Sequence, residues 1–198
     1  MSALTVARLA ALGLVVSLVS GCASTAFAPS SAVPSREALD RFSLEGRFSL
    51  SQDSKNYSGR LRWTYRGVSS ELLLSSPFGQ GIAEIVTDAR GAQLKTGDGK
   101  VFSAPDADTL TQEVLGYSLP LGLLADWVRG RVASGNARFD AQGRAIHLRQ
   151  DTWEVDYEYS DSDPGAPPVR IVARREGVLE LRVFVQEWHS LAVEETAQ

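Results

Sequence analysis

A regular alternation of apolar and polar side chains, beginning at Phe42, constrains the fold of this chain more than any other feature. Between residues 42 and 50 the apolar or small residues occupy every even position, and between 57 and 65 every odd position. Successive side chains of a strand point to opposite faces of a sheet. This period of two therefore predicts antiparallel strands with one apolar face and one wet face.

The same analysis extends to eleven strands and three short helices. The other strands are predicted at 71–76, 81–87, 92–96, 100–104, 136–140, 144–150, 153–159, 169–174 and 178–188, and the helices at 35–41, 106–115 and 120–129. So long a sheet should curl with its apolar face inside, under the two mid-chain helices. The expected fold is mainly β, a partial barrel whose interior is either filled by side chains or holds one small ligand. Periodicity leaves both options open.

Residues 1–21 have the features of a lipoprotein signal peptide. Arg8 gives a basic start, and the apolar run 9–20 is too short to span a bilayer as a stable helix. The run ends in Val19-Ser20-Gly21-Cys22, which resembles a bacterial lipobox. We therefore expect cleavage before Cys22 and a covalent lipid on it, an S-diacylglycerol and an N-acyl chain. The alternative is an ordinary secretory signal followed by a stray cysteine.

Residues 22–34 are mostly small residues and prolines, which predict a lipidated flexible tether, and residues 35–198 are predicted to form a single domain. Cys22 is the only cysteine, so no disulfide is expected. Three acyl chains would hold the protein firmly to a membrane, whereas one chain binds only marginally. Resemblance to other lipoproteins implies the outer membrane, facing the periplasm, because Ala23 stands where an aspartate would favour the inner membrane.

A large apolar residue stands where the tip of a loop is expected. Ser76, Pro77, Phe78 and Gly79 lie between two predicted strands. Pro77 cannot donate to a sheet, and Gly79 permits backbone angles that other residues resist. Loop tips are normally polar and solvated. Phe78 therefore either folds back onto the core or enters an apolar environment outside the domain, and the sequence leaves both interpretations open.

No residue pattern predicts catalysis or metal binding. His147 is expected to be an ordinary sheet residue, and His189 to be solvated near the end of the last strand. The segment 116–120 half-resembles a nucleophile elbow but lacks the second glycine and a preceding strand, so it predicts a connection between helices. A net charge of −4 makes nucleic acid an unsuitable partner. We expect no enzyme, no metal and no cofactor beyond the lipid on Cys22.

Several segments together resemble the LolB family of outer-membrane lipoprotein receptors. In chain order they are the lipobox, Gly46-Arg47-Phe48, 59–63, Ser76-Pro77-Phe78-Gly79-Gln80, Leu119-Pro120, Trp127 with Gly130, Trp153-Glu154-Val155-Asp156-Tyr157 and Trp188. The resemblance covers residues 39–188 and rests on order and spacing. It implies an unclosed antiparallel β half-barrel with the three helices as a lid over an apolar cavity. It also implies that Phe78 replaces an apolar loop residue, often Leu, needed for delivery into the membrane.

The resemblance further implies a role in lipoprotein transport. Such a receptor accepts lipoproteins from the periplasmic carrier LolA by binding their acyl chains in the cavity, and inserts them into the outer membrane. The implied partners are LolA, client lipoproteins and outer-membrane lipid, and a monomer is expected. The alternative is a structural or scaffolding outer-membrane lipoprotein with a filled β-barrel core. The expected cavity residues, taken from inward positions, are Phe48, Leu61, Trp63, Leu72, Leu74, Leu124, Trp127, Ile146, Leu148, Val155 and Tyr157.

Overall fold

A computed structural model describes residues 33–52, 55–160 and 162–191, and in this part of the chain all strands belong to one antiparallel sheet. The predicted lipidation site at Cys22 and most of the predicted tether lie outside the described residues. The strands are β1 (Phe42–Gln52), β2 (Lys55–Tyr65), β3 (Ser70–Ser75), β4 (Gly81–Asp88), β5 (Gly91–Thr96), β6 (Val101–Ala104), β7 (Asn136–Phe139), β8 (Ala145–Gln150), β9 (Trp153–Glu158), β10 (Arg170–Arg175) and β11 (Leu179–Ser190).

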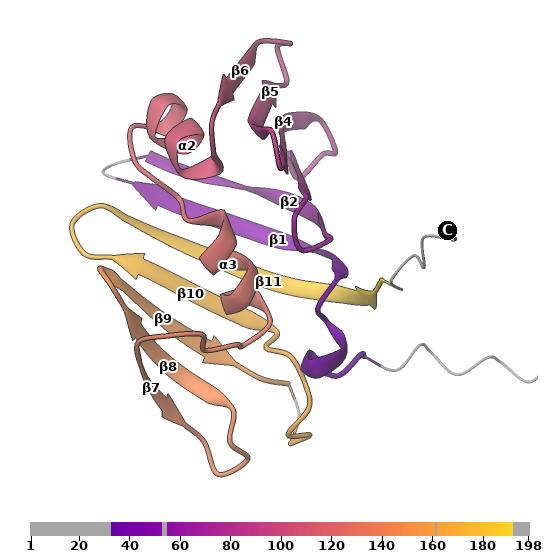
Figure 1. Cartoon of the computed structure of the whole chain (residues 1–198), viewed down its shortest axis with the longest axis vertical. Helices are drawn as coiled ribbons and strands as arrows, with labels where there is room; N and C mark the ends of the chain where they lie inside the picture. The colour runs from indigo at the N-terminus through magenta and orange to yellow at the C-terminus, as the bar shows by residue number, and fades with distance from the viewer. Residues whose placement is uncertain (1–32, 53–54, 161, 192–198) are drawn as a thin grey trace, which may run out of the picture. The chain divides into compact units, whose positions relative to one another are not determined.

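The sheet does not close into a barrel. Its order is β6-β5-β4-β3-β2-β1-β11-β10-β9-β8-β7, so successive strands pair as hairpins in each half and β1 joins the halves by pairing with β11. Within the described residues, β6 and β7 are the two unpaired edges. The predicted unclosed antiparallel sheet of eleven strands is therefore confirmed, and it curves around one face (Figure 1).

Two α-helices lie on the concave face of the sheet (Figure 1). They are α2 (Ala107–Leu115) and α3 (Leu121–Val128), and they carry the chain from the β6 edge to the β7 edge. Asp106 caps α2 by accepting a hydrogen bond from the Thr109 amide at 2.7 Å, and Gly116 ends it with φ +83°. α2 packs on β5 and β6, whereas α3 packs on β10. No described helix is long and apolar enough to cross a membrane.

The third predicted helix, at 35–41, is wrong in length and type. The structure has only a three-residue 3₁₀ turn there, η2 (Arg36–Ala38). Ser35 makes no side-chain cap, so the amides of the first turn gain no partner from it. Leu39 is fully buried in the core, which draws the chain inward just before β1 begins. A short helix without a cap is not stable by itself, and core packing decides this segment.

The hydrophobic core lies between the concave face of the sheet and α3. Its buried residues run from Leu39 to Trp188, and all of them belong to the compact unit 33–198. Every core residue in the described part of the chain therefore lies in this unit. Phe42 lies at the centre of an aromatic group, with the rings of Trp63, Tyr65 and Trp188 centred 5.3–5.5 Å away. Such edge-to-face and stacked contacts add to the burial of apolar area.

Candidate functional site

The loop between β3 and β4 is short and held by its own backbone. The Gly79 amide donates to the Ser76 carbonyl at 2.9 Å, and the Ser76 amide donates to the Gln80 carbonyl at 2.7 Å. The Ser76 hydroxyl also accepts a hydrogen bond from the Gln80 amide at 3.2 Å. Gly79 has φ +87°, a conformation that costs a residue with a Cβ. The loop is thus a defined turn.

Phe78, at the tip of this turn, is 95% exposed. Of the two interpretations that the sequence left open, folding onto the core is therefore wrong. An exposed Phe forgoes about 1.5–3 kcal/mol of burial free energy. The loop thus presents a large apolar side chain to whatever lies outside the domain.

Ile82, at the base of the same loop, is a second exposed apolar residue. In the pairing of β3 with β4, Leu74 lies opposite Ala83 and Ser75 lies opposite Gly81, so Ile82 is the extra residue of a bulge. Its side chain is 42% exposed. Bulges bend a strand and redirect its side chains. The bulge thus gives the Phe78 loop a second apolar contact residue that the sequence analysis did not identify.

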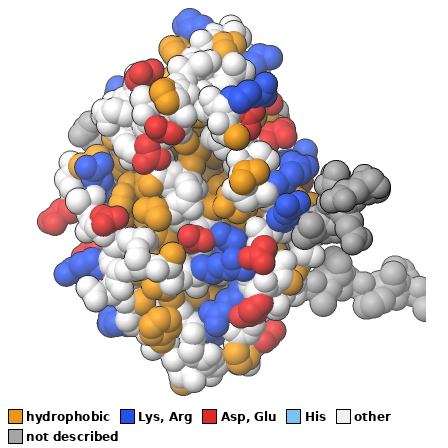
Figure 2. All heavy atoms as spheres, viewed as in Figure 1, with side chains coloured by type: hydrophobic (Ala, Val, Ile, Leu, Met, Phe, Trp, Pro, Cys, Tyr) orange, Lys and Arg blue, Asp and Glu red, His pale blue; other side chains and the backbone are white. Residues whose placement is uncertain are grey.

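Most of the predicted cavity residues do point into one apolar interior. Eight of them are buried in the core, and Phe48 and Leu74 pack against it from partly buried positions. The eight are Leu61, Trp63, Leu72, Leu124, Trp127, Leu148, Val155 and Tyr157. They come from strands of both halves of the sheet and from α3, so the topology gathers them under the helix. Figure 2, viewed on the helix-covered side, shows hydrophobic side chains reaching the surface in several places between charged ones.

Ile146 is the exception, and its predicted inward position is wrong. The pairing of β7 with β8 shifts between Arg138 and Phe139, which lie opposite His147 and Ala145, so Ile146 is an extra, unpaired residue. Ala145 is fully buried in its place, while Ile146 is 37% exposed. A bulge reverses the alternation beyond it, and periodicity alone cannot reveal that.

The C-terminal end of α3 is fixed by buried polar contacts. Arg129, at the end of the helix, is buried and donates to the carbonyls of Ala125 and Leu39 at 2.8 and 3.0 Å. Its third contact is an ion pair of 2.6 Å with Asp126, and its guanidinium lies 5.3 Å from the Tyr65 ring centre. Burial lowers the pKa of Arg129, which still carries its charge at neutral pH.

A second buried contact ties α3 to the far half of the sheet. The Trp127 indole donates to the Gln150 side chain at 2.8 Å, and Gln150 donates in turn to the Ser134 hydroxyl at 2.7 Å. At the N-terminal end of α3, Pro120 makes no side-chain cap, and the Leu119 amide just before the helix donates to the buried Thr111 hydroxyl of α2 at 2.9 Å. Leu121 and Leu124 hold that end through apolar contacts.

Two polar atoms of the interior have no hydrogen-bond partner among the described residues. They are the Tyr157 hydroxyl and the indole nitrogen of Trp188. A buried donor left unpaired costs about 1–3 kcal/mol. Burial raises the pKa of Tyr157, so its hydroxyl keeps its proton and remains a donor.

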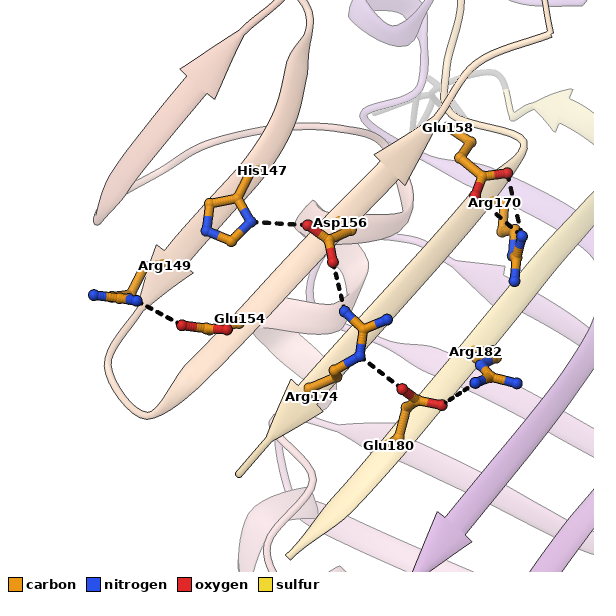
Figure 3. Close-up of polar contacts among 9 residues, drawn as sticks. All are labelled: His147, Arg149, Glu154, Asp156, Glu158, Arg170, Arg174, Glu180 and Arg182. Atoms are coloured by element: carbon orange, nitrogen blue, oxygen red, sulfur yellow. Dashed lines mark hydrogen bonds and ion pairs between the residues drawn. The ribbon is translucent and has the colours of Figure 1, made fainter. Parts of the chain in front are cut away.

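The outer face of the sheet carries a polar network (Figure 3). His147 lies 2.8 Å from Asp156, and Asp156 and Glu180 both contact Arg174. Burial raises the pKa of Asp156, but its hydrogen bonds with His147 and Arg174 outweigh that effect and the net pKa is lowered. His147 is therefore the sheet residue that was predicted. In the described part of the chain no group of His, Cys, Asp and Glu is arranged to hold a metal ion.

The comparisons with known proteins agree on one family. A family model described as outer membrane lipoprotein LolB matches residues 40–188. The chain belongs to the LolB family. Proteins named outer-membrane lipoprotein LolB are similar over most of their length. The one from Dechloromonas aromatica is 42% identical over 88% of this chain and 94% of its own, and the one from Thiobacillus denitrificans is 36% identical over 92% and 98%.

Membership of the LolB family makes this chain an outer-membrane lipoprotein. Among solved structures, a LolA superfamily protein from Nitrosomonas europaea aligns with a TM-score of 0.47 at 10% identity. The alignment covers 83% of this chain and 96% of that protein, and the assignment does not depend on it.

Sequence reasoning missed the polar residues that position α3 in this LolB-family chain. Arg129 was expected only as the end of a helix, and Gln150 only as a strand residue. The spacing of Asp126 and Arg129, three residues apart on a predicted helix, was the available signal. The contact of Trp127 with Gln150 joins segments far apart in sequence, and no pattern in either segment indicates it.

Proposed function

We propose that this chain accepts lipoproteins from the carrier LolA and passes them into the outer membrane. The acyl chains of the client enter the apolar interior between the sheet and α3. The observation that carries the proposal is Phe78, almost fully exposed at the tip of a defined turn in a LolB-family chain. An apolar tip of this kind suits entry into a bilayer at the moment of delivery.

The energetics of acyl chains support this role. A chain of sixteen carbons exposed to water is disfavoured by roughly 12 kcal/mol. A carrier must bury such chains, and a receptor must offer equal or better burial. If both interiors are apolar, a small difference in affinity is enough to transfer the client from carrier to receptor, and no nucleotide hydrolysis is needed.

The arrangement of α3 supports entry from one side. Its C-terminal end is held to Leu39 and to the sheet by Arg129 and Trp127, whereas its N-terminal end contacts the interior through Leu121 and Leu124 and is linked to α2 by the hydrogen bond of Leu119 with Thr111. The unpaired donors of Tyr157 and Trp188 suit the ester and amide oxygens at the head of an acyl chain.

The competing function is that of a structural outer-membrane lipoprotein with a filled core, and one observation favours it. The interior side chains form one continuous packed cluster, and two hollows, of about 250 and 600 Å³, are lined mostly by residues outside it. An environment-sensitive apolar dye separates the two functions. We expect the domain 33–198 to bind the dye and a lipoprotein to displace it. Failure of both dye and acyl chains to bind would support the filled core.

The lipid anchor has its own test. We propose that Cys22 carries the S-diacylglycerol and N-acyl groups, with cleavage before it. Mass spectrometry of the mature N-terminus should show an acylated Cys22, and an unmodified cysteine or cleavage elsewhere would refute this assignment.

We also propose that the chain has no enzyme activity. Gly116 ends α2 and the segment 116–120 leads directly into α3, so no strand delivers Ser118 as a nucleophile elbow would require. A panel of esters should give no turnover above a Ser118→Ala control, and turnover that this substitution abolishes would contradict the proposal.

A further inference from the structure

One row of the sheet's outer face carries arginines on three of four adjacent strands. Across β10, β11, β1 and β2 the directly paired residues are Arg170, Phe184, Arg47 and Arg60. The neighbours of Arg47 along β1, Gly46 and Phe48, point to the interior, so Arg47 points outward, away from the helices. Arg182, one step beyond Phe184 towards the β10–β11 hairpin, adds a fourth guanidinium.

The two central arginines lie opposite each other without an acidic partner. Arg47 pairs directly with Arg60, and among the described residues no carboxylate lies within ion-pair distance of either. Like charges directly opposite each other in a sheet are destabilising. The flanking Arg170 and Arg182 do have acidic partners, the exposed Glu158 and the partly buried Glu180 (Figure 3). The centre of the row is thus an uncompensated cationic pair on a chain of net charge −4.

The row borders a hollow that contains an exposed aromatic ring. The hollow has a volume of about 250 Å³ and is lined by Arg47, Arg170, Arg182 and Phe184, among others. Phe184 is 45% exposed within it. Arginines around an exposed aromatic ring are a combination that binds to the interface of an anionic membrane, where the ring enters the headgroup region.

The row leads to the loop that carries Phe78. Arg60 of β2 lies directly opposite Ser75, the last residue of β3, and Ser76 begins the loop. The cationic row therefore runs across the sheet to the end of β3, from which the Phe78 loop begins. This continuity favours a bilayer over an acidic protein as the partner, because a bilayer offers phosphates and an apolar layer side by side.

We propose that this outer face, from Arg170 to Arg60, docks on the surface of an anionic bilayer, with lipid phosphates between Arg47 and Arg60. The docked face lays the Phe78 loop against the membrane, ready for delivery. This inference rests on the proposed function, which identifies the membrane as the outer membrane. The contacts with the bilayer surface are made by residues of the sheet alone.

The test is flotation of the domain 33–198 with vesicles, since this unit holds every core residue that the structure describes. We expect wild type to bind vesicles of phosphatidylcholine with phosphatidylglycerol more strongly than phosphatidylcholine alone, and binding to weaken with salt. The double variant Arg47→Glu/Arg60→Glu should lose about tenfold or more of its binding to the anionic vesicles. Its binding to phosphatidylcholine should not change.

The matched control is Arg66→Glu/Arg138→Glu, which makes the same change in net charge at exposed positions elsewhere. Arg66 lies in the loop after β2, and Arg138 on the edge strand β7. We expect the control to bind anionic vesicles nearly as wild type does. An equal loss in both double variants would overturn the proposal, because net charge alone would then explain binding.

A folding measurement completes the test. Arg47→Gln and Arg60→Gln remove like-charge repulsion, so each should leave the melting temperature unchanged or raised. A marked fall would show that the arginines have a structural role and would overturn the proposal. We expect transfer from LolA, measured without membranes, to be independent of these arginines. A wild-type domain that takes no lipoprotein but binds anionic vesicles through this row would refute only the proposed function.

Discussion

At the scale of single residues, Arg129 determines how firmly α3 is held. Replacing it in Arg129→Met removes its contacts with Leu39, Ala125 and Asp126 while keeping a long apolar side chain. We expect a loss of about 2 kcal/mol in the free energy of unfolding. Urea unfolding measures it, with Arg149→Met as control, since the exposed Arg149–Glu154 pair should contribute well under about 1 kcal/mol. Equal losses in the two variants would contradict this role.

Replacing Tyr157 should have the opposite effect on stability from replacing Arg129. Because its hydroxyl has no hydrogen-bond partner among the described residues, Tyr157→Phe should leave the stability unchanged or raise it by about 1 kcal/mol. If the hydroxyl donates to the head of a bound acyl chain, the variant should bind a monoacylglycerol more weakly and a plain alkane equally well. Calorimetry with both ligands checks this, and equal affinities of wild type and variant for the monoacylglycerol would refute it.

At the scale of elements, the network on β8–β11 predicts a pH dependence of stability. The pKa of Asp156 is below its ordinary value of 3.8 in the folded chain. A carboxyl with a lowered folded pKa contributes stability above its unfolded pKa, and that contribution is lost as the pH falls through the folded pKa. The melting temperature of wild type should therefore exceed that of Asp156→Asn at neutral pH, and the difference should shrink below about pH 4. A difference in melting temperature that does not change with pH would contradict a contribution from the charge of Asp156.

The helices and strands also show how much of the fold the sequence could predict. All eleven strands were expected, because alternation reports a half-buried sheet directly. The residues whose positions were predicted wrongly lie where a bulge or a core contact interrupts the alternation of apolar and polar side chains. The bulge at Ile146 adds a residue that periodicity does not register, and Leu39 is drawn into the core where a helix was expected. Ile82 was missed for the same reason as Ile146.

The candidate site was less predictable than the fold. Phe78 was visible because an apolar residue between proline and glycine is unusual at a loop tip. The buried contacts of Arg129 and Gln150 were not visible, because each joins segments that only the tertiary fold brings together. The row of Arg47 and Arg60 required the register of β1 and β2, which alternation within each strand does not fix.

At the scale of the whole molecule, the proposed function assigns acceptance of a client and its release to different parts of the chain. In the proposed function the interior under α3 accepts acyl chains, whereas Phe78 is 95% exposed and is not part of the described core. Phe78→Glu should therefore change the free energy of unfolding by less than about 0.5 kcal/mol. Because the interior is intact, the variant should still accept lipoprotein from LolA, and because a charge resists entry into a bilayer, it should fail to release it.

The most direct test follows a labelled lipoprotein from LolA to the mature protein and then into liposomes, for wild type and Phe78→Glu. We expect both proteins to take the client from LolA and only wild type to deliver it to the liposomes. The proposed function is wrong if wild type takes no client from LolA, or if Phe78→Glu delivers it as well as wild type does.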